Sequence, residues 1–274
     1  MTGIPPLAVI TGAARGIGRQ IAQDLIAEGY RVVIGDLDLG ATTATAKELG
    51  TAASPVRLDV TDPALVAAVI DQIEAEHGPI DVWINNAGIM PTGAFAEQSA
   101  DVAQRIIAIN YSAVVSATGL VLARMLRRRS GTIVNLASAT GLKPLAGVAV
   151  YSGTKAAVIA FSDALRRELR GTGVRVTVVM PNLVRTAMGA GITPPSLTGA
   201  LTAADVSRAT VRAIRRGRFW VVVPRRLGPL LRFGKSLPFG AQDWIDDRVG
   251  SDNIGLHGDP AVRESYARDV LDKQ

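Results

Sequence analysis

The sequence has no cysteine and only two histidines, His77 and His257, among its 274 residues. Because a disulfide bond needs two cysteines, the fold has to be held together by packing and hydrogen bonds. A zinc site built from cysteine and histidine ligands is excluded because two histidines cannot supply the ligands it needs, and we expect no metal. Any redox chemistry therefore depends on an organic cofactor.

The N-terminal region has little positive charge and no cleavage signature, so we interpret its apolar run Leu7–Ile10 as a strand and not as a signal peptide. The long segment Ile106–Ala123 carries no charge, and polar residues such as Asn110 and Thr118 lie within it. A buried helix is favoured over a membrane span by that composition. We expect a cytoplasmic protein.

Positive charge is concentrated in one part of the chain, although the net charge is only +6. From Arg212 to Lys235 there are eight basic and no acidic residues, and the remainder has eight acidic and four basic ones. Nucleic acid is not an expected partner, because this segment offers few aromatic side chains for base stacking. Residues 225–239 mix leucine with arginine, a pattern that permits contact with an anionic membrane surface. Since Pro229 and Pro238 interrupt any long helix, we favour packing on the same domain or on a neighbouring subunit.

Short apolar runs alternate with longer helical patterns along most of the chain. Near-continuous apolar strands indicate a parallel sheet buried on both faces, and strand–helix alternation indicates right-handed crossovers. We therefore expect an α/β protein: a single Rossmann domain with a doubly wound, mostly parallel seven-stranded sheet and helices on both faces. The expected strands are Leu7–Thr11, Arg31–Asp36, Pro55–Leu58, Val82–Ile84, Gly131–Ala137, Arg175–Val179 and Phe219–Val223. The expected helices include Gly16–Glu28, Pro63–His77, Val102–Arg129, Ala149–Arg170 and Ala203–Arg216.

A glycine-rich segment, Thr11-Gly-Ala-Ala-Arg-Gly-Ile-Gly18, follows the first expected strand and begins a helix. Gly12, Gly16 and Gly18 would let the backbone approach a pyrophosphate at the positive helix N-terminus, with Arg15 and Ile17 between them. An ordinary glycine-rich turn is the alternative. The second expected strand ends at Asp36, followed by Leu37, where a carboxylate can bind the adenosine ribose hydroxyls. Asp36 could instead cap a helix, but Asp38 can supply that cap.

The carboxylate of Asp36 also favours NAD over NADP. A 2′-phosphate about 4 Å from a carboxylate costs roughly 2–4 kcal/mol in a partly solvated site. Arg15 can reduce that cost by pairing with the phosphate, unless Asp36 already pairs with it. We expect NAD as the cofactor and NADP as the less favoured one. On this basis residues 1–224 form a dinucleotide-binding and catalytic Rossmann domain, and 225–274 form an irregular, basic-then-acidic extension of it.

Tyr151 and Lys155 are four residues apart, so they share a helix face. A lysine charge about 5 Å from the phenol favours phenolate by roughly 3 kcal/mol, or about two pKa units. Tyr151 could then serve as a general acid and base near neutral pH. The pair is common on helices, so its weight depends on the rest of the chain. Ser138 follows the end of an expected strand, at the edge where doubly wound proteins place their sites, and can orient a substrate oxygen.

Together these motifs resemble the short-chain dehydrogenase/reductase family over about Leu7 to Val223. They are Thr11-Gly-x-x-x-Gly-x-Gly18, Asn85-Asn-Ala-Gly88, Asn110, Ser138, Tyr151-x-x-x-Lys155 and Pro181-Asn-Leu-Val-Arg-Thr186. The sequence departs from the family where Asn182 replaces a usual glycine, and asparagine is the residue that best tolerates positive φ after glycine. The resemblance implies an oxidoreductase that moves a hydride between a dinucleotide and a secondary alcohol or ketone.

The resemblance also implies roles for individual residues. Catalysis would use Asn110, Ser138, Tyr151 and Lys155, with Lys155 also holding the nicotinamide ribose and Asn110 anchoring a water that relays protons. A plain buried amide that satisfies backbone groups is the alternative for Asn110. The cofactor would meet Asp59 and Val60 at its adenine, Asn86, Ala87 and Gly88 beneath it, and Pro181, Val184 and Thr186 near its carboxamide. A homodimer or homotetramer would pair the helices Val102–Arg129 and Ala149–Arg170.

The segment Ala187–Leu201 contains Gly189, Gly191, Pro194 and Pro195 and is expected to form a lid over the substrate. Its residues are small or apolar, as are Met90, Pro91, Leu142, Leu145 and Val148, while Lys143 and Arg185 are the only obvious cations nearby. This favours a neutral, lipophilic alcohol or ketone such as a steroid-like, retinoid-like or long-chain compound. The alternatives are an NADPH-dependent carbonyl reductase and a catalytically silent, dinucleotide-sensing regulator.

Overall fold

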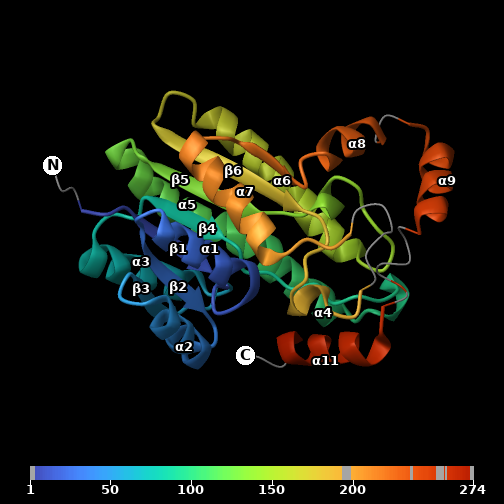
Figure 1. The fold of residues 1–274 in the computed structure, drawn as a ribbon, viewed down its shortest axis with the longest axis horizontal. Coiled ribbons are helices and arrows are strands. Elements are labelled where there is room, and N and C mark those ends of the chain that lie inside the picture. The colour runs from blue at the N-terminus through green and yellow to red at the C-terminus, as the bar shows by residue number, and fades with distance from the viewer. Residues whose placement is uncertain (1–3, 193–198, 235–236, 251–255, 257, 272–274) are drawn as a thin grey trace.

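The computed structural model describes residues 4–192, 199–234, 237–250, 256 and 258–271. Its centre is a seven-stranded sheet in which every neighbouring pair is parallel, in the order β3-β2-β1-β4-β5-β6-β7 (Figure 1). The predicted α/β class and seven-stranded parallel sheet are therefore confirmed. The strands are β1 (Leu7–Thr11), β2 (Arg31–Asp36), β3 (Ala53–Arg57), β4 (Val82–Asn85), β5 (Gly131–Leu136), β6 (Val174–Pro181) and β7 (Trp220–Val223).

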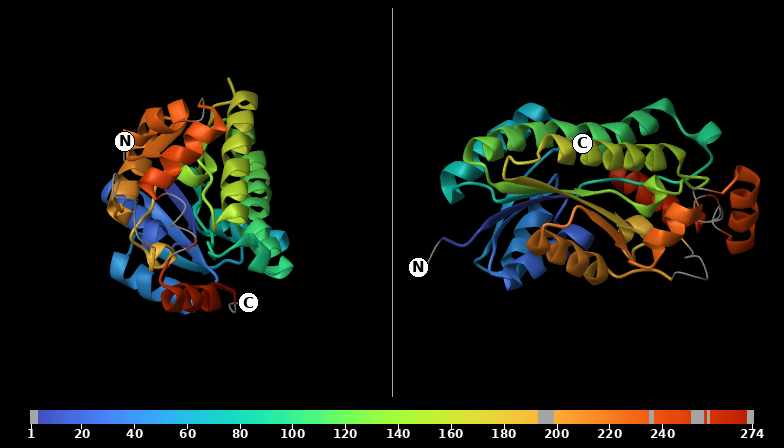
Figure 2. Two further views of the ribbon diagram at one scale, coloured as in Figure 1. Left: turned by 90° about the vertical axis from the view of Figure 1, so that its right-hand side faces the viewer. Right: turned by 90° about the horizontal axis from the view of Figure 1, so that it is seen from above.

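Helices cover both faces of the sheet, with α1, α2 and α7 on one side and α3, α5 and α6 on the other (Figure 2). Side chains alternate between the two layers along each strand: Ile10 packs with the first group of helices and Val9 with the second. Both faces are therefore buried, as the continuous apolar strands predicted. These helices are α1 (Gly16–Ala27), α2 (Leu39–Leu49), α3 (Pro63–His77), α5 (Ala113–Arg128), α6 (Ala149–Glu168) and α7 (Ala203–Arg216).

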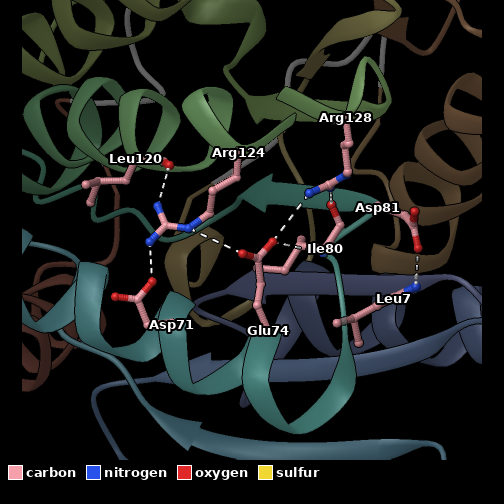
Figure 3. A network of polar contacts seen from close by, with 8 residues as sticks. All are labelled: Leu7, Asp71, Glu74, Ile80, Asp81, Leu120, Arg124 and Arg128. Atoms are coloured by element: carbon pink, nitrogen blue, oxygen red, sulfur yellow. Dashed lines mark hydrogen bonds and ion pairs between the residues drawn. The ribbon is translucent and has the colours of Figure 1, made fainter. Parts of the chain in front are cut away.

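Polar contacts join α3 to α5 within that second layer (Figure 3). Arg124 of α5 pairs with Asp71 and lies 3.3 Å from a Glu74 carboxylate oxygen, and Arg128 lies 3.4 Å from the other oxygen. Arg128 also donates to the carbonyl oxygen of Ile80, just before β4. These pairs are partly exposed, so we expect each to contribute no more than about 1 kcal/mol to stability.

The helix predicted over Val102–Arg129 is interrupted. It consists of α4 (Ala100–Ile107), a π-helical turn η2 (Ala108–Ser112) and α5. By length and composition alone, the run Ala100–Arg128 is also long and apolar enough to cross a membrane. Val114, Ala117 and Val121 are buried in the protein interior, however, so the run serves here as a core helix, as predicted.

The C-terminal extension is more regular than its prolines and glycines predicted. It forms α8 (Leu227–Gly234), α9 (Phe239–Val249) and α11 (Pro260–Leu271), which lies beyond α4 along the lower edge in Figure 1. Pro238 caps α9 and Pro260 starts α11, positions where a helix tolerates proline. Within the basic segment 225–239, Leu227 is buried on the domain, while Leu230 and Phe233 are exposed. Lys235 and Ser236 lie outside the described residues.

Candidate active site

A cleft of about 810 Å³ lies along the edge where the parallel strands end. Nearly all the predicted site residues line it, including those that follow β1, β2, β4 and β5. They are Gly12, Arg15, Gly16, Ile17, Asp36, Leu37, Asp59, Val60, Asn86, Ala87, Gly88, Ser138, Tyr151, Lys155, Pro181, Val184 and Thr186. The two predicted residues outside the lining, Gly18 and Asn110, are buried.

The glycine-rich turn between β1 and α1 is tightly packed. Gly12 has φ +63°, and a Cβ atom there would lie 2.8 Å from the Cα of Ala87. A Cβ on Gly18 would lie 2.6 Å from the side-chain nitrogen of Asn86. No side chain among the described residues caps the first turn of α1, so its N–H groups can bind an anion. This end of the cleft suits a pyrophosphate.

The segment after β4 braces that turn. Asn86 donates from its side-chain amide to the carbonyl oxygens of Thr11 and Gly12 at 2.9 and 2.8 Å. The Thr11 hydroxyl oxygen accepts from the backbone N–H groups of Asn86 and Ala87, each at 3.0 Å. Asn86 and Ala87 therefore tie the end of β4 to the neighbouring strand β1 and to the glycine-rich turn.

Asp36 presents its carboxylate to the cleft at the end of β2. One oxygen accepts from the Ala14 N–H at 3.2 Å, and Asp38 caps α2 in its place by accepting from Ala41. Arg15 does not form an ion pair with Asp36. Arg15 instead contacts Asp269 of α11, with 3.0 Å between nitrogen and oxygen.

Ser138, Tyr151 and Lys155 come together beside the end of β5. Tyr151 and Lys155 lie one turn apart on α6, with the Lys155 Nζ atom 5.6 Å from the ring centroid. Ser138 hydrogen-bonds to the Tyr151 phenol, and its hydroxyl oxygen accepts from the N–H and hydroxyl of Thr140 at 3.2 and 3.0 Å. Two neighbouring hydroxyl groups at a cleft can hold the oxygen of a carbonyl or an alcohol.

The expected lowering of the Tyr151 pKa is wrong for this structure. Burial raises the pKa of Tyr151 from 10.0 to about 12, and its hydrogen bond with Ser138 opposes the rise only in part. Burial also lowers the pKa of Lys155 from 10.5 to about 8. The Lys155 ammonium donates to the carbonyl oxygen of Leu136 at 2.9 Å. Tyr151 is therefore a neutral phenol at pH 7, the form that donates a proton.

Asn110 is completely buried within the π-helical turn η2. Its amide oxygen accepts from the Ile89 N–H and its amide nitrogen donates to the Ile89 carbonyl, each at 2.9 Å. A Cβ on Gly88 would lie 3.1 Å from the Asn110 oxygen and 3.6 Å from the Lys155 Nζ atom. Asn110 therefore fixes the backbone next to Lys155, which corresponds to the structural alternative for this residue.

The segment after β6 forms the other wall of the cleft. Val184 bridges to Leu201, and Thr186 is the nearest neighbour of the Cβ position on Gly16. Arg129 is the single non-glycine residue with positive φ among the described residues, so Asn182 does not need a left-handed conformation. Within the expected lid Ala187–Leu201, residues 193–198, including Pro194 and Pro195, lie outside the described residues.

The substrate half of the cleft is mostly apolar. Met90, Leu145 and Val148 line it as expected, whereas Pro91 and Leu142 do not. Arg185 also lines it, while Lys143 pairs with Asp246 of α9 at 2.5 Å. Ile192 of the expected lid also lines the cleft, and the lining residues that were not predicted include Arg105, Ile109, Thr140, Tyr266 and Val270.

Comparisons with known proteins agree with this geometry. The profile of the family described as short chain dehydrogenase matches residues 6–196. The chain is 39% identical over 221 residues to the ketoacyl reductase HetN of Nostoc sp., which covers 78% of this chain and 77% of that protein. It is 34% identical over 202 residues to the 3-oxoacyl-(acyl-carrier-protein) reductase FabG of Salmonella typhimurium, covering 74% of this chain and 83% of that protein.

Solved structures with the same fold include a short chain dehydrogenase/reductase from Burkholderia phymatum in complex with NAD. That structure has a TM-score of 0.77 and 27% identity, and the match covers 85% of this chain and 94% of the other. A serine dehydrogenase from Escherichia coli has a TM-score of 0.69 and 29% identity, covering 79% of this chain and 96% of the other.

Proposed function

This chain belongs to the short-chain dehydrogenase/reductase family, an NAD(P)-dependent family of oxidoreductases, and we propose that it interconverts a lipophilic secondary alcohol and the matching ketone with NAD(H). The observation that carries the proposal is the convergence of Ser138, Tyr151 and Lys155 in the cleft that the glycine-rich turn also lines. A pyrophosphate site and a proton donor in one cleft are what hydride transfer to a carbonyl requires.

The proposed reaction uses the protein's own groups for binding and proton transfer. Ser138 and Tyr151 hold the substrate oxygen between two hydroxyl groups. The bound dinucleotide supplies the hydride for the carbonyl carbon, or accepts it in the reverse direction. Tyr151 gives its proton to the oxygen as the alcohol forms, and it is protonated at neutral pH because burial raises its pKa. Lys155, which is buried beside it, is cationic below about pH 8 and stabilises the phenolate that remains.

Two carboxylates support NAD as the cofactor over NADP. Asp36 lines the cleft at the end of β2, where it would face the adenosine ribose and repel a 2′-phosphate. Arg15 is the nearby cation that could offset this repulsion, and it pairs with Asp269. Because both residues of that pair are substantially exposed, at 58% and 41%, we expect its effect to be smaller than that of Asp36.

A long-chain oxoacyl compound is the lipophilic substrate that we favour over a steroid-like or retinoid-like one. The substrate half of the cleft is lined by apolar side chains such as Ile109, Leu145 and Val148. Two relatives at 39% and 34% identity are named as reductases of ketoacyl compounds. An apolar wall accommodates an acyl chain, and the pair of hydroxyl groups receives its keto oxygen.

We further propose a cytoplasmic homodimer or homotetramer that pairs the helices α5 and α6 of neighbouring copies. Leu126 of α5 is 38% exposed, which leaves apolar surface on that helix. Light scattering after gel filtration tests the proposal. A dimer or tetramer that becomes a monomer in Leu126→Glu supports it, and a monomeric wild-type protein contradicts it.

The first experiment on the proposed function is a fluorescence titration with NADH and with NADPH, followed by a turnover screen. The screen uses 3-oxoacyl thioesters, aliphatic ketones and secondary alcohols of increasing chain length. Tight NADH binding and turnover of oxoacyl compounds are the expected results. Tighter NADPH binding supports the carbonyl-reductase alternative. Cofactor binding without turnover of any compound supports the silent regulator.

A further inference from the structure

The C-terminal helix α11 lies against the cleft from outside the segment that the family profile matches. That match ends at residue 196, and α11 covers Pro260–Leu271. The helix begins with an Asp259 cap, whose carboxylate accepts from the N–H groups of Ala261 and Val262. Tyr266 and Val270, one turn apart on the helix, both line the cleft. This wall therefore comes from a part of the chain that the family profile does not describe.

Arg263 holds α11 to two separate loops. Its side chain is 6% exposed, and its nitrogens donate to the carbonyl oxygens of Met90, Met188 and Ala190 at 2.5, 2.7 and 3.2 Å. It also donates to the Thr92 hydroxyl at 3.0 Å. One guanidinium thus joins the loop after β4, the loop after β6 and the C-terminal helix.

The buried guanidinium of Arg263 is held by neutral oxygen atoms and not by a carboxylate. The acceptors of these four hydrogen bonds are carbonyl or hydroxyl oxygens, and no ion pair between Arg263 and an acidic side chain forms within the described residues. Burial lowers the pKa of the Arg263 guanidinium. A buried cation without a carboxylate is tolerated only if its hydrogen bonds are well satisfied. Loss of this side chain would therefore release both loops from α11.

Tyr266 connects α11 to the substrate half of the cleft. Its hydroxyl oxygen accepts from the Met90 N–H at 3.1 Å, and the Arg263 guanidinium lies 4.8 Å from its ring centroid. The ring is 8% exposed and lines the cleft. Val270 packs on the apolar cluster that contains Tyr151 and Ile192. The helix thus contributes to the same apolar surface as the proposed proton donor.

We infer that α11 completes the substrate site: Tyr266 contacts the acyl chain of the substrate and sets chain-length preference, while Arg263 is a positioning residue that holds Tyr266 in place. This inference rests on the proposed function, because it assumes an oxoacyl or ketone substrate with its reacting oxygen at Ser138 and Tyr151. It assigns to α11 a role in selecting substrates and none in proton or hydride transfer.

The test compares Tyr266→Ala with Tyr266→Phe across 3-oxoacyl thioesters of short, medium and long chain. Removal of the ring is expected to raise the KM for the long substrate roughly tenfold or more relative to the short one. The affinity for NADH should stay at the wild-type value. Tyr266→Phe keeps the ring, so it should keep the wild-type order of preference. Glu264→Gln, on the exposed side of the same helix, is the matched control and should behave as wild type.

The test of the positioning role of Arg263 needs a measurement that a general loss of stability would not change. Arg263→Leu is expected to reproduce the change in chain-length preference of Tyr266→Ala. The KM for the long substrate should rise, and the kcat for the short substrate should stay nearly unchanged. Arg263→Lys, which can still donate to some of the carbonyls, should restore part of the preference. Equal losses of kcat and NADH affinity for all substrates would overturn the positioning role, as would a wild-type preference in Arg263→Leu.

The inference and the proposed function fail in different ways. If wild type turns over oxoacyl compounds and Tyr266→Ala matches Glu264→Gln, the inference is wrong and the proposed function stands. If wild type turns over none of them, calorimetry of the long-chain thioester binding to the NADH complex decides. Weaker binding in Tyr266→Ala than in wild type then supports the inference, and no binding to wild type overturns both.

Discussion

The Nζ atom of Lys155 lies 5.6 Å from the centroid of the Tyr151 ring, yet its hydrogen bond goes to the carbonyl oxygen of Leu136 at 2.9 Å. Burial acts on both groups and favours their neutral forms, raising the pKa of Tyr151 to about 12 and lowering that of Lys155 to about 8. At pH 7 the pair is a neutral phenol beside an ammonium group. In this state the Tyr151 phenol can donate its proton to a ketone oxygen.

The first prediction concerns stability and pH at Lys155. Its pKa is about 8 in the folded protein and 10.5 without burial, so the unfolded chain binds the proton more tightly. Between about pH 8 and pH 10.5 the unfolded chain is protonated at Lys155 while the folded protein is not. The free energy of unfolding therefore decreases as the pH falls through this window to about 8, and it increases as the pH rises toward 10.5. Relative to Lys155→Met, the free energy of unfolding of wild type should rise by about 1.4 kcal/mol per pH unit at most within that window.

Urea unfolding at several pH values measures this difference. The titration of Tyr151 does not interfere below about pH 10, because its raised pKa affects stability only between 10.0 and about 12. Lys47→Met, which removes an exposed lysine from α2, is the control and should show no such slope. A flat difference between wild type and Lys155→Met across the window would contradict the burial of an ionisable Lys155.

The second prediction concerns cofactor choice. Asp36→Asn removes the charge that would face a 2′-phosphate, and NADPH affinity should rise roughly 10- to 100-fold. Asp269→Asn frees Arg15 from an exposed ion pair, so NADPH affinity should rise by no more than about fivefold. Fluorescence titration gives the dissociation constants for both cofactors.

Asp38→Asn is the control for these cofactor variants. It removes a charge two residues from Asp36, while asparagine can still cap α2. Its effect on the ratio of NADPH to NADH affinity should be smaller than that of Asp36→Asn. The assignment of Asp36 is wrong if the two variants change that ratio equally.

The third prediction separates the two roles considered for Asn110. Asn110→Ala leaves the buried N–H and carbonyl of Ile89 without their partner, which should cost roughly 2–4 kcal/mol of unfolding free energy. Ser112→Ala, at an exposed position of the same π-helical turn, should cost little. Thermal or urea unfolding measures both. An Asn110→Ala protein of wild-type stability but reduced turnover would favour the proton-relay role instead.

The sheet and most of the site follow from local sequence. Apolar strands such as Val32–Ile34 are buried on both faces, and motif residues placed just after strands meet because parallel strands end at one edge. Gly12, Asp36 and Ser138 line one cleft for that reason. Spacing along the chain was sufficient to find them, because each is positioned by the strand that precedes it.

Other features depend on tertiary packing and have no local signature. The prediction for the Tyr151 pKa considered only the nearby lysine charge, whereas burial of the phenol, which spacing does not reveal, raises that pKa. The contribution of α11 was missed because Arg263 binds backbone carbonyl oxygens of distant loops. Every residue has a backbone carbonyl, so the sequence does not show which ones Arg263 contacts. Pro229 and Pro238 prevent one long helix here, but Pro229 lies near the start of α8 and Pro238 caps α9, so short helices still form.

The most direct test of the central claim is turnover by Tyr151→Phe, measured with NADH and the preferred oxoacyl substrate. Loss of the phenolic proton should lower kcat at least about 100-fold while NADH affinity stays close to wild type. Tyr30→Phe, a tyrosine outside the cleft lining, should keep wild-type turnover. Near wild-type turnover by Tyr151→Phe, with the cofactor bound normally, would contradict the assignment of Tyr151 as the proton donor.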